Sequence, residues 1–135
     1  MNRFYFNKLV RDSIVQNFLD DPKVIKAVYR TLDDEAYHRE LLNKITEEAE
    51  EIPYGGHSDE ALEELADLQC VVDALRDQLG FSEDQVRKAV NVKSQKKGKF
   101  ELRHYVDYVD LAPDSEWIAY FRSQSGKYKE GVIEG

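Results

Sequence analysis

The segment ITEEAEEIPYGGHSDEALEELAD, residues 45–67, holds two acidic runs separated by a break. Nine of the residues from Thr46 to Asp67 are carboxylates, and none is Lys or Arg. Pro53 and the two glycines that follow Tyr54 interrupt any helix, whereas the apolar residues on either side recur at helical spacing. The segment therefore predicts the centre of an antiparallel helical hairpin.

Helical spacing also predicts where the acids of each arm point. Apolar residues three or four apart form one face of the first arm: Tyr37, Leu41, Ile45, Ala49 and Ile52. At about 100° per residue, Glu48 falls inside this face and Glu51 at its edge, whereas Glu50 points to solvent. On the second arm, Glu64 and Asp67 take matching positions beside an apolar face. Each arm thus offers two acids three residues apart, which are neighbours on a helix surface.

Acids in these positions favour a metal site. Burying an unpaired carboxylate costs several kcal/mol unless a cation or a proton compensates. The segment supplies no Lys or Arg, and oxygen-only ligands suit Mg²⁺ or Mn²⁺. A solvated acidic face, with the carboxylates bent outward into water, is the alternative. The same three-residue spacing of two acids recurs on both arms, which favours the metal site over the solvated face.

The rest of the chain also predicts mainly helices. A short amphipathic helix ends near residues 20–22, and a long helix runs from Asp33 or Asp34 to about Ile52. After the turn, Ser58 or Asp59 begins the second arm, which ends at Gly80. A third helix begins at Ser82 and ends at Gly98, and residues 115–122 form another. Residues 24–32 and 100–109 alternate in part and predict a short two-stranded ribbon.

Composition excludes several classes of protein. The chain has 135 residues, which fits one domain, and a formal net charge of −8, which argues against nucleic-acid binding. It shows neither a signal peptide nor a membrane span, so we expect a cytoplasmic protein without membrane contact. The lone Cys70 offers no intrachain disulfide and no cysteine-based zinc site. Its place in a helical pattern predicts a small buried side chain.

Four blocks of the chain carry a family resemblance: NKLVRDSI (7–14), YRTLDDEAYHRELLNKITEEAEE (29–51), EELADLQCVVDAL (63–75) and KKGKFELR (96–103). Together they contain ExxE at Glu48 and Glu51, a turn, and ExxD at Glu64 and Asp67. The blocks resemble the MazG-like all-α nucleoside triphosphate pyrophosphohydrolases, in the branch similar to phosphoribosyl-ATP pyrophosphohydrolase. The resemblance implies a MazG-like helical bundle over residues 1–111, followed by a C-terminal extension over 112–135.

The resemblance also implies a reaction and roles for the acids. The reaction is hydrolysis of a nucleotide between the α and β phosphates, which gives the monophosphate and pyrophosphate. Glu48, Glu51, Glu64 and Asp67 would hold Mg²⁺, with Mn²⁺ as the alternative. Glu47 would be a further ligand or would orient the attacking water, so Glu47 and Glu48 are the expected catalytic residues.

Phosphate groups also attract cationic side chains. Lys93 and Lys97 continue the apolar face of the third helix, and Lys96 lies near its edge, so we expect these lysines to contact the substrate. Lysines at a helix C-terminus also favour the helix dipole, which is the simpler explanation. Lys8 and Arg11, in the first family-like block, are either substrate contacts or structural salt bridges.

Two other functions fit parts of the sequence. A di-iron bundle needs two Glu-x-x-His motifs on helices. Glu35 and His38 form one on a predicted helix, whereas Glu101 and His104 have the same spacing in a predicted strand. A non-catalytic acidic helical adaptor that binds a nucleotide or a metal fits the same fold. Residues 68–75 are apolar around most of the helix circumference, which predicts a second packing layer and hence a homodimer or homotetramer.

Overall fold

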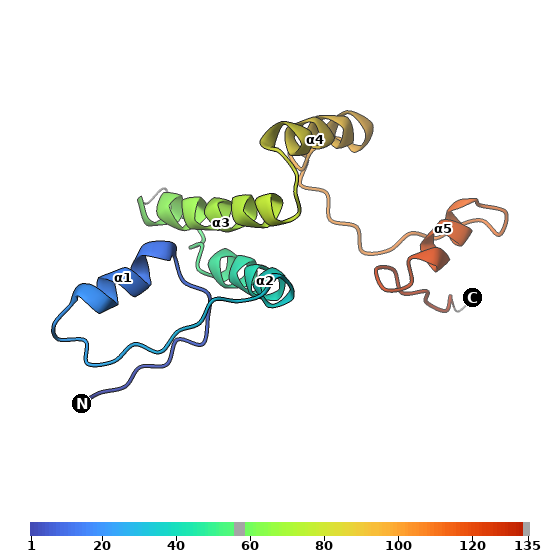
Figure 1. The fold of residues 1–135 in the computed structure, drawn as a ribbon. Coiled ribbons are helices and arrows are strands. Elements are labelled where there is room, and N and C mark those ends of the chain that lie inside the picture. The colour runs from blue at the N-terminus through green and yellow to red at the C-terminus, as the bar shows by residue number, and fades with distance from the viewer. Residues whose placement is uncertain (56–58, 134–135) are drawn as a thin grey trace. The chain divides into compact units, whose positions relative to one another are not determined.

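A computed structural model describes residues 1–55 and 59–133. It contains five helices and no strand in these ranges (Figure 1): α1 (Asp12–Asp20), α2 (Asp34–Glu50), α3 (Asp59–Gln78), α4 (Glu83–Lys97) and α5 (Trp117–Ser123). The prediction of a mainly α protein is confirmed. Ser58, one of the two residues expected to begin the second arm, lies outside the described residues.

The chain separates into two units, Met1–Lys96 and Lys97–Gly135. The first unit contains α1, α2 and α3 and all the acids of the ExxE and ExxD motifs. The second contains α5, whose Trp117 and Phe121 rings stack at 5.4 Å between centroids and lie close to Tyr128. The predicted domain boundary at residues 111 and 112 stays a prediction.

Local signals explain where the helices begin and end. The Asp33 carboxylate accepts a hydrogen bond from the Ala36 N–H at 2.8 Å and so caps α2. Ser82 and Gln85 form a reciprocal capping box, in which each side chain bonds the other residue's N–H, at 3.1 and 2.8 Å. Gly80 follows α3 with φ +81°, a left-handed conformation that glycine adopts without strain.

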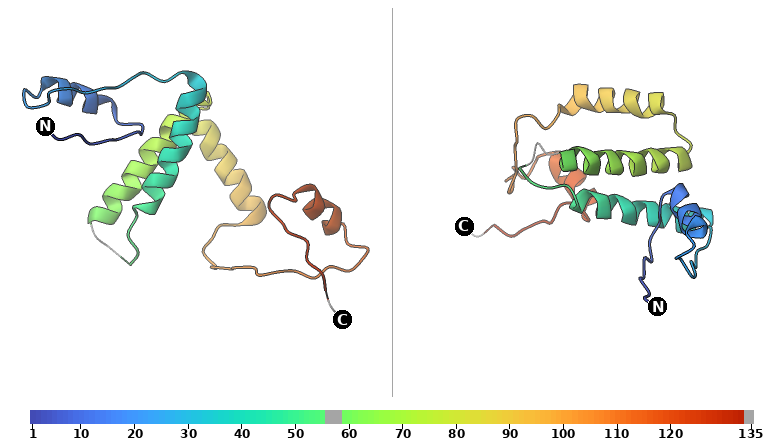
Figure 2. Two further views of the ribbon diagram at one scale, coloured as in Figure 1. Left: turned by 90° about the horizontal axis from the view of Figure 1, so that it is seen from below. Right: turned by 90° about the vertical axis from the view of Figure 1, so that its left-hand side faces the viewer.

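The first unit is built around the α2–α3 hairpin, whose two helices lie side by side (Figure 2). Leu41, with 1% of its surface exposed, is the one buried apolar residue in the described part of the chain. Half-buried Tyr37 and Ile45 extend its face on α2, but Ala49, expected on that face, is exposed. The predicted hairpin is thus confirmed, and the two helices bury little of their surface in one chain.

The end of the hairpin away from the acids is closed by polar contacts. His38 lies 3.2 Å from Gln78 through its Nδ1 atom, and Gln78 donates to the Asp34 carbonyl at 2.8 Å. His38 therefore joins α2 to α3, which agrees with a packing role rather than with an iron ligand. None of the described helices is both long enough and apolar enough to cross a membrane.

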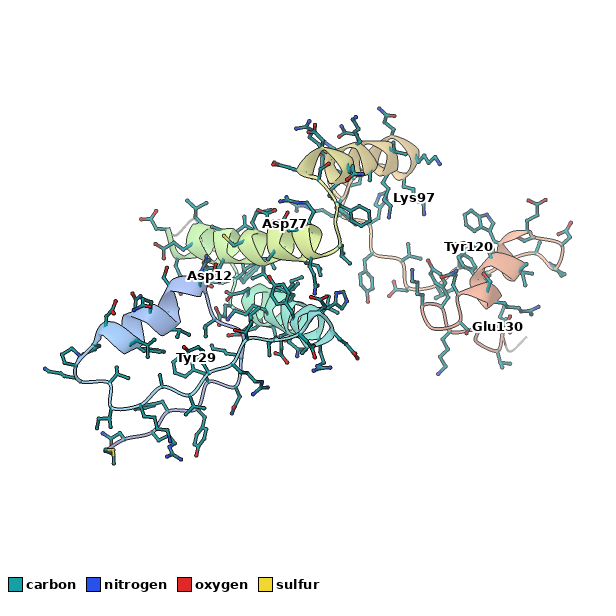
Figure 3. All side chains as sticks on the ribbon, viewed as in Figure 1. Asp12, Tyr29, Asp77, Lys97, Tyr120 and Glu130 are labelled. Atoms are coloured by element: carbon teal, nitrogen blue, oxygen red, sulfur yellow. The ribbon has the colours of Figure 1, made fainter. Side chains whose placement is uncertain are left out.

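The two predicted strands are not formed. Residues 24–32 and 100–109 are neither helix nor strand, and Tyr29 is among many exposed apolar side chains there (Figure 3). Alternating residues become a strand only when a neighbouring strand pairs with their backbone groups and a core covers one face. Within the described residues neither segment has a paired strand or a covering core, so the two-stranded ribbon is not observed there.

Candidate metal centre

The site acids gather where α2 ends and α3 begins. Glu47 and Glu48 lie in the last turn of α2, Glu51 is its C-cap residue, and no basic residue occupies that turn. The C-terminal end of a helix carries a partial negative charge, so carboxylates there are unfavourable without a cation. Glu64 and Asp67 face them from the early turns of α3. The backbone thus concentrates negative charge at this end of the hairpin.

Three of the acids converge closely enough to hold one ion. Glu48, Glu51 and Glu64 each offer a carboxylate oxygen within 4.8 Å of the others. Glu48 is only 8% exposed, and one oxygen each of Glu48 and Glu64 is buried with no hydrogen-bond partner. Buried oxygens without partners are rare in folded proteins. A set of carboxylates with two unsatisfied buried oxygens fits a hard divalent cation, which accepts oxygen ligands.

The pKa values of Glu48 and Glu64 reflect the crowding of the acids. Burial raises the pKa of Glu48, and repulsion from Glu51 raises it further. Burial also raises the pKa of Glu64, together with its hydrogen bond to Glu51 and with repulsion from that acid. Both shifts mean that burial and repulsion outweigh the compensation that the metal-free chain supplies, because an adjacent cation such as Lys44 beside Glu48 lowers the pKa instead.

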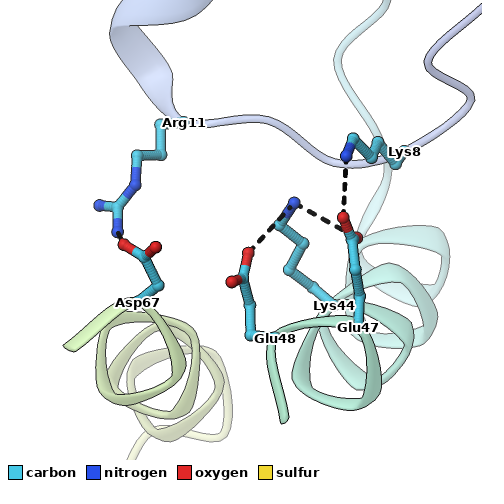
Figure 4. Close-up of polar contacts among 6 residues, drawn as sticks. All are labelled: Lys8, Arg11, Lys44, Glu47, Glu48 and Asp67. Carbon is cyan, nitrogen blue, oxygen red and sulfur yellow. Dashed lines mark hydrogen bonds and ion pairs between the residues drawn. The ribbon is translucent and has the colours of Figure 1, made fainter. Parts of the chain in front are cut away.

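Basic partners reach the acids from outside the acidic segment (Figure 4). Lys8 Nζ lies 2.8 Å from Glu47 Oε1, and Arg11 Nη2 lies 2.7 Å from Asp67 Oδ1. Lys44 Nζ lies 3.3 Å from Glu47 and 3.5 Å from Glu48. The expectation that the acids lack basic partners is therefore wrong for Glu47 and Asp67. It holds for Glu51, Glu64 and the second oxygen of Glu48.

Sequence reasoning missed Lys44 although a signal was present. Lys44 precedes Glu47 by three residues and Glu48 by four, and such pairs are neighbours on a helix. The partners Lys8 and Arg11 had no comparable signal, because they lie 39 and 56 residues from the acids that they contact. Only the tertiary structure brings them to the hairpin.

Residues 7–11, which we call the N-terminal strap, carry Lys8 and Arg11 to the two arms. Asn7 adopts φ +47°, a left-handed conformation that asparagine tolerates better than most residues. Leu9 and Val10 are half-buried, whereas Lys8 and Arg11 are exposed. Cys70 is exposed on α3 and not buried as expected. Its thiol and Asp67 both hydrogen bond with Arg11, and these contacts raise the pKa of Arg11.

The lysines of α4 do not join this cluster. Lys93 and Lys96 are exposed and make no ion pair or hydrogen bond with any described residue. Lys97 belongs to the second unit, which is described separately. The apolar face that these lysines continue is itself exposed at Val86 and Val90. Substrate contact by the three lysines stays a prediction.

No family model, curated protein or solved structure matches the chain. The resemblance to the MazG-like family therefore remains a prediction based on the four sequence blocks. The geometry adds an independent observation, which is the convergence of Glu48, Glu51 and Glu64 at one end of a helical hairpin.

Proposed function

We propose that the chain is a Mg²⁺-dependent nucleotide pyrophosphohydrolase of the MazG-like type, with Mn²⁺ as an alternative ion. The observation that carries the proposal is Glu48, whose carboxylate is nine-tenths buried and keeps one oxygen without a partner beside Glu51 and Glu64. A purely solvated acidic face would turn that oxygen to water, and a structural ion pair would supply it with a cation. A divalent cation satisfies it and also compensates Glu51 and Glu64.

In this proposal Glu48, Glu51, Glu64 and Asp67 hold the ion. When bound, a divalent ion neutralises phosphate charge and lowers the pKa of a coordinated water. Glu47 lies next to the cluster, where its carboxylate would orient the attacking water. Phosphoryl transfer depends mainly on positioning and electrostatics, so carboxylates fixed on two packed helices are suited to it. The products would be a nucleoside monophosphate and pyrophosphate.

The proposal also includes a MazG-like helical bundle that needs contacts between chains in addition to those within one chain. Leu65 and Val72 on α3 and Leu79 just beyond its end lie seven residues apart and are all exposed, a spacing that suits packing against another helix. We propose a second copy of the chain as the occupant, because this apolar row belongs to one of the two hairpin helices and few apolar residues of the first unit are buried. Such a homodimer or homotetramer would act in the cytoplasm, and residues 24–32 and 100–109 would pair as strands within it.

Product analysis tests the proposed reaction. The purified chain would be incubated with ribo- and deoxyribonucleoside triphosphates, with and without Mg²⁺, and monophosphate, pyrophosphate and orthophosphate would be separated. We expect monophosphate and pyrophosphate in equal amounts, only with Mg²⁺ or Mn²⁺. Glu48→Gln should abolish turnover, because it removes the ligand charge at the most buried position.

Glu50→Gln is the matched control, since Glu50 is an exposed acid on the same helix. It should turn over substrate like the unmodified chain. A folded chain that binds Mn²⁺ and a nucleotide but releases no product from any triphosphate would favour the non-catalytic adaptor. A folded chain that binds no divalent ion would refute the metal site.

A further inference from the structure

Two of the five predicted site acids are already paired with cations of the N-terminal strap. Lys8 holds Glu47 on α2 at 2.8 Å, and Arg11 holds Asp67 on α3 at 2.7 Å. The three acids without such partners, Glu48, Glu51 and Glu64, are those that converge within 4.8 Å. The strap therefore contacts both arms of the hairpin at the proposed metal site (Figure 4).

We propose that Lys8 and Arg11 are internal counter-ions, which leave Glu47 and Asp67 when a divalent cation binds and then contact the substrate's phosphates. The inference rests on the proposed function. It assigns to the strap a rearrangement that couples metal binding to the binding of a polyphosphate.

Three observations favour ion pairs that exchange partners and speak against salt bridges that stay fixed. Both basic side chains are exposed, with 45% of the Lys8 side chain and 59% of the Arg11 side chain accessible, and exposed ion pairs are weak. The charge of the Lys8 amine interacts favourably with several acids of the cluster. Its hydrogen bond to Glu47 and the charges of Glu51 and Glu48 all raise its pKa. Lys44 would remain to balance Glu47 and Glu48 after Lys8 leaves.

The substrate explains where the strap cations would go. Once a divalent cation has bound the acids, Lys8 and Arg11 become cations without partners at the edge of a site that must receive several phosphate charges. Arginine and lysine both bind phosphate oxygens, arginine through two parallel hydrogen bonds. The strap would thus weaken metal binding and strengthen substrate binding. A structural salt bridge does not produce these two opposite effects.

The test compares the unmodified chain, a Lys8→Gln/Arg11→Gln double variant and Arg87→Gln. Arg87 is the control, since it forms an exposed ion pair with Asp84 on α4 at 2.6 Å and contacts none of the site acids. Isothermal titration would give the Mn²⁺ affinity of each chain and the affinity of each Mn²⁺-loaded chain for inorganic pyrophosphate. Amide hydrogen exchange of residues 1–20 would be followed in the unmodified chain with and without Mn²⁺.

We expect the double variant to bind Mn²⁺ about two- to fivefold tighter, as the loss of weak competing ion pairs predicts. It should bind pyrophosphate several-fold more weakly, Arg87→Gln should match the unmodified chain, and Mn²⁺ should speed exchange in the strap. Strap exchange that is unchanged or slower with Mn²⁺ bound overturns the inference and leaves the metal site standing. Failure of the unmodified chain to bind Mn²⁺ overturns both, so the two failures are distinguishable.

Discussion

At the residue scale, Glu48 combines burial with an oxygen that has no partner. Its place inside the apolar face of α2 could be predicted from helical spacing alone, because the helix period fixes the direction of a side chain. The cations around it could not all be predicted. Lys44 follows from helical spacing, whereas Lys8 and Arg11 reach the acids through a tertiary fold whose long-range contacts leave no pattern in the sequence.

Replacing Glu48 with Gln should stabilise the metal-free chain while it abolishes activity. The substitution removes a buried charge that Lys44 compensates only in part, and we expect a gain of up to about 1 kcal/mol. Thermal unfolding in a chelator measures it. Excess Mg²⁺ should raise the melting temperature of the unmodified chain but not that of Glu48→Gln. A lower melting temperature for Glu48→Gln in chelator would mean that the Glu48 charge is stabilised by its surroundings, chiefly Lys44.

The pH dependence of stability should have an unusual sign in the metal-free chain. The folded-state pKa of Glu48 and of Glu64 is raised above the ordinary value of 4.5. Their contribution to stability is therefore complete below pH 4.5 and is lost as the pH rises through the raised pKa values. The pKa of Glu47 is lowered, chiefly by its hydrogen bond with Lys8, so its contribution is present above pH 4.5 and is lost at lower pH.

Denaturation in a chelator between pH 4.5 and 7 would measure this dependence. We expect stability to fall as the pH rises from 4.5, and saturating Mg²⁺ should reverse the trend because the ion binds ionised carboxylates. Glu48→Gln should weaken the slope in chelator. A slope that is the same in Glu48→Gln would show that Glu48 does not titrate in this range.

At the scale of elements, the helix ends were predictable and the strands were not. Asp33, the Ser82–Gln85 capping box and Gly80 each act within a few residues of chain, and each does so in the structure. A strand needs a partner that supplies hydrogen bonds along its whole length. Residues 24–32 and 100–109 have a strand-like composition but form no strand in the described part of the chain, so the ribbon stays a prediction.

The α2–α3 hairpin should depend on one leucine. Leu41 is 1% exposed, whereas its neighbour Leu42 is 46% exposed. Leu41→Ala should cost about 2–5 kcal/mol, the usual range for a buried leucine, and Leu42→Ala should cost far less. Urea denaturation followed by circular dichroism would compare them. Equal costs would indicate that Leu42 is covered in solution, which would point to a partner on that face of α2.

At the scale of the whole molecule, the described residues expose many large apolar side chains and bury only Leu41 among apolar residues. A protein of 135 residues ordinarily buries a substantial core. The proposed second copy would cover Leu65 and Val72 on α3 and Leu79 just beyond its end. The apolar circumference of residues 68–75 predicted from the sequence that this helix needs a further packing partner. Where that partner packs could not be predicted, because it does not follow from one chain alone.

Self-association should therefore be sensitive to one face of α3. Val72→Arg places a charge in the middle of the exposed apolar stripe and should shift the chain toward monomer in analytical ultracentrifugation. Glu63→Arg is the control, because Glu63 is exposed on the other side of the helix and should leave association unchanged. A monomeric unmodified chain at high concentration would refute the proposed oligomer.

The ion pairs of Lys8 and Arg11 also determine how many divalent ions the charge of the site can balance. When all are ionised, the five acids carry a charge of −5. Lys8, Arg11 and Lys44 contribute +3, so the net charge is −2, which one divalent cation balances. With Lys8 and Arg11 released, only the +1 of Lys44 remains, and the deficit becomes −4, the charge of two such cations. Release of the strap on metal binding therefore predicts two ions per chain by charge balance, whereas one ion per chain would indicate that the strap stays on the acids.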